Sequence, residues 1–124
     1  MQYYQEFAEW LDKHLNQELP DEIVAFSFNV YEGADPTWHI ELVGTDEFDE
    51  EDEDWACSEV FTTRENMYFI PRLEELEDWK SSLKLVENLV SEYLKNGDYA
   101  SKLKATQAVA VGFVDGDLQI VYRQ

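Results

Sequence analysis

Carboxylates dominate the side chains of this sequence that could do chemistry. Every residue from 46 to 54 except Phe48 is an Asp or a Glu, in the stretch DEFDEEDED, and Trp55 follows directly. Eight acids within nine residues repel one another, so such a run favours a surface that meets positive charge. Aromatic residues beside that charge are typical anchors of protein interfaces. The pattern predicts a docking surface for a basic partner. Its candidate contact residues are Asp46, Glu47, Phe48, Asp49, Glu50, Glu51, Asp52, Glu53, Asp54 and Trp55.

Two alternatives use the same carboxylates differently. The run could be a solvated loop that maintains solubility, or it could hold a divalent cation. A twelve-residue calcium loop needs acids at positions 1, 3 and 5, glycine at position 6 and glutamate at position 12. Counting from Asp49 puts Asp54 at the glycine position and Val60 at the glutamate position. We therefore expect weak binding of divalent ions without a defined metal site, and we expect no cofactor.

Nucleophiles and general bases are few. The chain has one cysteine, Cys57, and two histidines, His14 and His39. His14 lies on a helical stripe, His39 lies in an alternating strand, and Cys57 reads as a small buried residue, so a thiol–imidazole pair is disfavoured. The five glycines are scattered among turns, which excludes a glycine-rich phosphate loop, and no Cys/His spacing fits a zinc site. We predict that the protein is not an enzyme.

The distribution of charge narrows the class of partner. The 124 residues carry a net charge of −19. Residues 1–63 hold eighteen acids and one base, a sum of −17, whereas residues 64–124 hold ten acids and eight bases, a sum of −2. Nucleic acid and anionic membranes would be repelled, and cationic protein surfaces would be attracted. The partner is therefore expected to be a basic protein.

The cellular setting follows from what the sequence lacks. A single cysteine excludes an intramolecular disulfide framework and suits a reducing compartment. No apolar run approaches about eighteen residues, the length a membrane span needs. The opening MQYYQEFAEWLDKHL has no basic start and carries acids among its apolar residues, unlike a signal peptide. We expect a cytoplasmic protein.

The apolar pattern predicts the elements that must position the acidic run. Apolar residues at helical spacing indicate an N-terminal helix over residues 3–16 and a long central helix over residues 71–95, whose stripe includes Trp79 or Lys80. Alternating apolar residues indicate strands. The expected strands are residues 23–31, 37–43, 55–63, 109–113 and 118–122.

Turn residues connect these elements. The stretch EGADP at 32–36 and the Asp-Gly pair at 115–116 each lie between two alternating runs, which favours antiparallel hairpins. Gly97 is suited to end the central helix, and a short helical turn follows at 99–103. No period could be assigned to residues 65–71.

The order of elements is α-β-β-β-α-β-β. It predicts a single α+β domain over residues 1–124. We expect a mainly antiparallel sheet of roughly five strands, with the two helices on one face.

One stretch resembles a known class of proteins. WHIELVGTDEFDEEDEDWACSEVF, in a small acidic α+β domain, is similar to the small acidic immunity proteins of bacterial polymorphic-toxin and contact-dependent inhibition systems. Such proteins bind and neutralise a cognate toxin domain, often a basic nuclease, by covering its active site. The resemblance implies that residues 46–55 contact the toxin and that none of them is catalytic. A nucleic-acid mimic that occupies the nucleic-acid site of another protein is an alternative.

Overall fold

A computed structural model describes residues 3–33, 36–72, 78–113 and 116–124, and within them the chain is α+β, as predicted. The helices are α1 (Tyr4–Leu15), α2 (Trp79–Asn96) and α3 (Ala100–Lys104). The strands are β1 (Ala25–Glu32), β2 (Thr37–Thr45), β3 (Glu59–Thr62), β4 (Tyr68–Pro71), β5 (Ala108–Phe113) and β6 (Gln119–Arg123). Two short 3₁₀ helices flank β3, namely η1 (Glu53–Cys57) and η2 (Arg64–Asn66).

The strands form one mixed sheet in the order β3-β2-β1-β5-β6, and β4 pairs with β2 along the same edge as β3. β1 lies antiparallel to β2, with Phe28 opposite Leu42, and parallel to β5, with Phe28 opposite Val111. β5 and β6 are antiparallel. Both predicted hairpins are confirmed, although their turn residues 34–35 and 114–115 lie outside the described residues.

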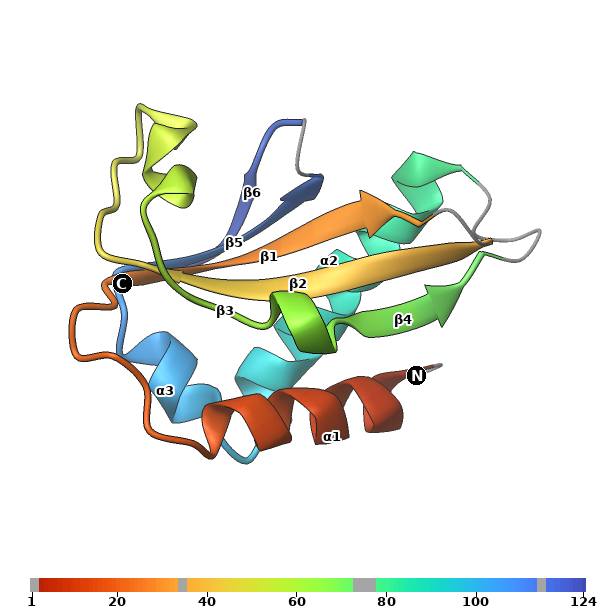
Figure 1. The fold of residues 1–124 in the computed structure, drawn as a ribbon, viewed down its shortest axis with the longest axis horizontal. Coiled ribbons are helices and arrows are strands. Elements are labelled where there is room, and N and C mark those ends of the chain that lie inside the picture. Colours follow the sequence, from red (N-terminus) through yellow and green to blue (C-terminus); the bar gives the residue numbers. More distant parts are fainter. Residues whose placement is uncertain (1–2, 34–35, 73–77, 114–115) are drawn as a thin grey trace.

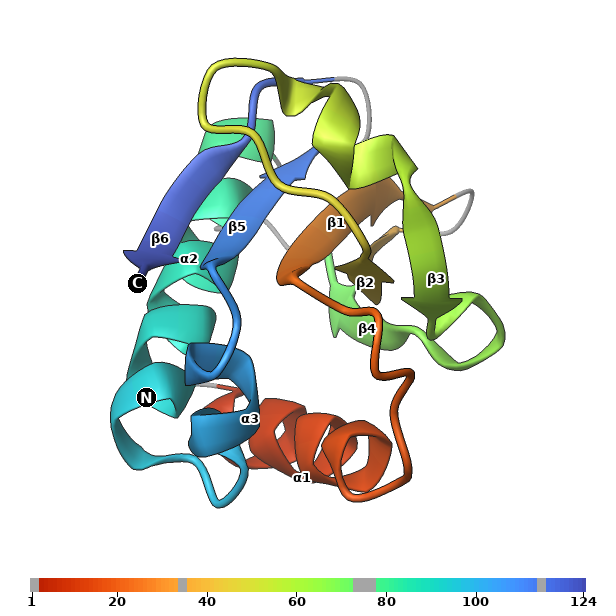
Figure 2. The same cartoon turned by 90° about the vertical axis from the view of Figure 1, so that its left-hand side faces the viewer.

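The two faces of the sheet are covered differently. On the side that we call the helical face, large residues such as Phe26, Phe28 and Val111 are buried against the helices and form the main core. On the outer face, β1 and β5 present small side chains, including Ala25 and Ala110. Figures 1 and 2 show α1 and α3 on one side of the sheet and the yellow-green acidic segment on the other.

Tyr93 of α2, which is completely buried, connects this helix with α1 and with the residue before α3. Its hydroxyl donates a hydrogen bond to Asp12 Oδ1 (2.5 Å) and accepts one from the backbone N–H of Tyr99 (3.1 Å). Gly97 follows α2 with a φ of −69°, a conformation open to any residue. A Cβ atom at Gly97 would lie 2.5 Å from atoms of the Tyr93 ring. Glycine is therefore required there for space rather than for a left-handed cap.

The expected strand over residues 55–63 is only partly correct. β3 covers Glu59–Thr62, whereas Glu53–Cys57 forms η1. The side chain of Asp52 starts this turn by accepting a hydrogen bond from the N–H of Asp54 (3.0 Å). Trp55 consequently belongs to the segment that covers the sheet and not to a strand.

In the described part of the chain, the sheet has six strands instead of roughly five because residues 65–71 contain β4. β2 is nine residues long, and β3 pairs only with its final part. β4 pairs with the first part of β2, from Thr37 opposite Pro71 to Ile40 opposite Tyr68. The extra strand thus satisfies backbone groups that β3 leaves unpaired.

The prediction that the central helix begins at Pro71 is wrong. Pro71 is the last residue of β4, at the edge of the sheet, where a missing N–H is tolerated. α2 begins at Trp79, and the Asp78 side chain caps it by accepting a hydrogen bond from the N–H of Ser81 (2.8 Å). Residues 73–77 of the predicted helix lie outside the described residues. Trp79 occupies the first turn and is 54% exposed, not buried in a stripe.

We predict that Gly97→Ala lowers the free energy of unfolding by about 1–3 kcal/mol, because the new methyl group overlaps the immobile ring of Tyr93. Urea unfolding measures the change. Gly116→Ala is the matched control, since the nearest atom to its Cβ would be Phe113 Cβ at 3.5 Å, an ordinary contact. Equal losses in both variants would contradict the steric argument.

Candidate functional site

The acidic loop, which we define as residues 46–54, is fixed to the outer face by Trp55. This side chain is 3% exposed and packs on Ala25 of β1 and Ala110 of β5. Phe48 meets its ring edge-on, with the ring centroids 5.2 Å apart and the planes at 70°. The alanines leave room for the indole close to the sheet. The small side chains of the outer face therefore leave space for the large side chain of Trp55.

Short acidic side chains hold the backbone of the acidic loop. Asp49 Oδ1 accepts a hydrogen bond from the N–H of Glu51 (2.9 Å), and Asp52 Oδ1 accepts one from the N–H of Asp54 (3.0 Å). An aspartate can reach the N–H two residues ahead, which makes it a turn former. The loop is therefore a sequence of defined turns.

β6 and the residue before it provide further attachments. Arg123 forms an ion pair with Glu50 (Nη1 to Oε1, 2.7 Å), and its guanidinium lies 5.3 Å from the centroid of the Phe48 ring. Glu53 Oε2 accepts a hydrogen bond from the backbone N–H of Leu118 (3.0 Å). Among the described residues, Arg123 is the only cation paired with the acidic loop. The loop thus keeps a large excess of negative charge.

The ten predicted contact residues lie together but differ in exposure. Trp55 is buried and Phe48 is half-buried, so these two hold the loop from below. The exposed residues are the eight acids Asp46, Glu47, Asp49, Glu50, Glu51, Asp52, Glu53 and Asp54. A partner would therefore meet carboxylates first.

A buried carboxylate that the sequence reasoning missed lies beside this loop. Glu41 of β2 is completely buried on the outer face and accepts hydrogen bonds from the hydroxyls of Tyr31 (2.5 Å) and Thr62. Arg64 bridges Glu41 (Nε to Oε2, 3.3 Å) and Glu59 (Nη2 to Oε2, 3.0 Å). Burial, followed by the hydrogen bond to Glu41, raises the pKa of Tyr31 to about 12. The sequence feature that could have indicated this site is Glu41 itself, an acid between the alternating apolar residues of β2.

We predict that Tyr31→Phe lowers the free energy of unfolding by about 1.5–3 kcal/mol, because the buried Glu41 carboxylate loses a hydrogen-bond donor. Tyr122→Phe is the matched control, since its hydroxyl donates to the carbonyl of Lys104 (3.0 Å) at an exposed position. Urea unfolding of both variants checks the difference. A loss for Tyr31→Phe no larger than that of the control would show that Glu41 does not need this donor.

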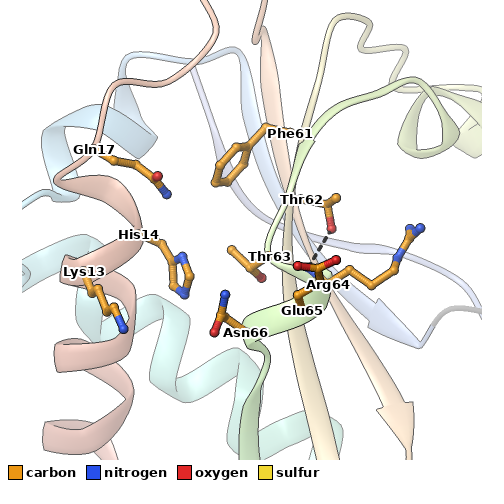
Figure 3. A pocket seen from close by; sticks show the side chains of 9 residues that line it. All are labelled: Lys13, His14, Gln17, Phe61, Thr62, Thr63, Arg64, Glu65 and Asn66. Carbon is orange, nitrogen blue, oxygen red and sulfur yellow. Dashed lines mark hydrogen bonds between the residues drawn. The ribbon is translucent and has the colours of Figure 1, made fainter.

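A second candidate site is a cavity of about 530 Å³ between α1 and the segment that follows β3. His14 lines it and is 7% exposed, and its Nε2 atom has no hydrogen-bond partner among the described residues. The ring packs on Trp10 with centroids 5.2 Å apart, and the Trp10 indole N–H donates to the carbonyl of Asn66 (2.6 Å). Figure 3 shows the Arg64 side chain leading away from His14. Among the described residues, no carboxylate forms an ion pair with the His14 imidazole in this cavity.

Burial is the main reason that the pKa of His14 lies below its ordinary value. The charge of Lys13 lowers this pKa further, and the nearby backbone of Asn66 opposes both effects. The folded protein consequently favours the neutral imidazole. His14 is buried on α1, as its position on the helical stripe predicts.

We predict that His14 makes folding less favourable as the pH falls from about 7.5 to about 5.5, around the ordinary histidine pKa of about 6.5. In this window the unfolded chain binds a proton at His14 more readily than the folded chain, because the folded pKa is lowered. Melting temperatures of the wild type and His14→Gln should therefore move closer together as the pH falls. A difference that is constant or grows on acidification would contradict this sign.

Cys57 and His14, which were considered as a thiol–imidazole pair, are not brought together. Cys57 is exposed at the end of η1, not buried as predicted, because the 3₁₀ turn that directs Trp55 inward directs Cys57 outward. His14 belongs to α1, on the opposite side of the sheet. Within the described ranges, no group of three or more His, Cys, Asp or Glu residues is arranged to hold a metal ion. The divalent-ion alternative has no geometric site there.

Comparison with known proteins found no match. No known protein family, curated protein or solved structure matches this chain. None of the helices in the described part of the chain has the length and apolar character needed to cross a membrane.

Proposed function

We propose that this chain is a non-enzymatic acidic binding protein that neutralises a basic protein, and that it serves as an immunity protein for a toxin domain in the bacterial cytoplasm. The observation that carries the proposal is the acidic loop, whose eight exposed carboxylates are held on a folded support with one paired cation among the described residues. The free, exposed thiol of Cys57 suits a reducing compartment.

The excess charge supports fast capture of a basic partner. A concentrated negative field steers a cationic surface toward the loop and raises the association rate, most strongly at low salt. The anchoring by Trp55 and Arg123 adds a second advantage. A loop that is already ordered loses less conformational entropy when it binds.

The burial of Trp55 and Phe48 determines what each of these aromatic residues can do in this proposal. Trp55 is too deeply buried to contact a partner directly, so it acts by holding the carboxylates in place. Phe48 is half-buried between Trp55 and Arg123 and presents part of its ring. The proposed contact surface therefore consists of the eight acids and the exposed edge of Phe48.

We predict that the triple variant Asp46→Asn, Glu51→Gln and Asp54→Asn slows association with the basic partner on the order of tenfold at low salt. Their side-chain carboxylates make no hydrogen bond or ion pair in the structure, so the loop should keep its conformation. The partner is first captured from a lysate of the source cells and purified. Stopped-flow association at about 50 and 300 mM salt then gives the rates.

The control is the triple variant Glu6→Gln, Glu9→Gln and Glu18→Gln, which removes the same number of charges from exposed positions on or just after α1. Its association rate should fall much less. Equal slowing in both variants would show that net charge, and not the acidic loop, attracts the partner. Co-expression completes the test, because an immunity protein must restore growth to cells that express its partner.

A further inference from the structure

Two adjoining cavities form a groove at the carboxyl ends of β1 and β5. One has a volume of about 430 Å³ and lies between the acidic loop and the outer face. The other, of about 600 Å³, lies beside the start of α2. Both are lined by Tyr31, Phe113 and Gly116, so the two cavities adjoin at this end of the sheet, one beside the acidic loop and the other beside Trp79.

The two ends of the groove differ in chemistry. Glu53, Asp54 and Glu59 line the first cavity, and its one cation, Arg64, is already paired with Glu59 and Glu41. Its described lining therefore keeps an excess of negative charge.

The second cavity is mainly aromatic. Trp79 is 54% exposed and meets Phe113 edge-on, with the ring centroids 6.0 Å apart. Phe113 in turn packs against the buried Trp38 at 5.6 Å. An exposed tryptophan supported by a buried aromatic stack resembles the anchors of protein interfaces. This end of the groove suits a large apolar side chain.

We propose that the groove binds an extended segment of a basic protein, with an arginine in the acidic cavity and a large apolar side chain against Trp79. The proposal rests on the proposed function, because the segment belongs to the same basic partner. A planar guanidinium can stack on the shared aromatic residues while it pairs with carboxylates. The two cavities share Tyr31, Phe113 and Gly116, so nearby side chains of one extended segment of the partner can reach both.

The probe is the peptide acetyl-Gly-Arg-Ser-Leu-Gly-amide, titrated into ¹⁵N-labelled protein at low salt and followed by amide chemical shifts. We expect shifts at Asn29, Tyr31, Leu118 and the Trp79 indole. Trp79→Ala and Asp54→Asn should each raise the Kd about threefold or more, since one removes apolar contact and the other an ion pair. A peptide with citrulline in place of arginine should bind more weakly.

Each substitution has a control of the same kind at a position outside the groove. Phe69→Ala removes another large hydrophobic residue, which is 57% exposed on β4, and Asp21→Asn removes one aspartate charge from an exposed position between α1 and β1. Both should leave the Kd unchanged. Trp79 is largely exposed, so loss of folding does not complicate its replacement.

The outcomes separate this inference from the proposed function. Shifts confined to residues 46–52 would overturn the groove and leave the acidic loop as a general docking surface. Equal effects of Asp54→Asn and Asp21→Asn would also overturn the groove, because net charge would then account for the binding. An absence of peptide shifts would also overturn the groove. Specific binding in the groove together with failure to capture any basic protein would support the groove and remove the proposed partner.

Discussion

The burial of Trp55 against Ala25 and Ala110 sets the position of the acidic loop against the mutual repulsion of its carboxylates. Burying a large apolar side chain contributes about 1.5–3 kcal/mol. Eight acids in nine residues oppose any compact arrangement, and only the ion pair to Arg123 offsets them directly among the described residues. The charged surface therefore depends on an uncharged contact beneath it.

This contact is possible because the two faces of β1 and β5 carry side chains of different size. Large residues such as Phe28 and Val111 fill the core on the helical face. On the outer face, Ala25, Ala110 and Gly112 add little side-chain volume. A second helix layer on the outer face would need large apolar residues there. The acidic loop and η1 cover this face instead, which brings carboxylates close to a hydrophobic sheet.

The sequence was sufficient where a local period dominated. α1, β1, β2 and the hairpin of β5 and β6 follow directly from apolar spacing and turn residues. Local patterns were insufficient where pairing between distant segments decided the outcome, as in β4, whose four residues are too few to show a period. The start of α2 was misplaced because the stripe continued backward past the cap at Asp78. The acids of the candidate site were evident, but the buried position of Trp55 depends on the alternating small residues of β5, whose meaning is clear only once β5 lies beside β1.

The parallel pairing of β1 with β5 also bears on the order of folding. Ala25 and Ala110, the floor beneath Trp55, are 85 positions apart in the sequence. Contacts of such large sequence separation form late, because a long segment of chain must be closed before they contribute any stability. The acidic loop consequently reaches its anchored conformation only after the far end of the chain has joined the sheet. An incompletely folded molecule carries all of the negative charge without the surface that organises it, so the ordered acidic surface is acquired only with the complete sheet.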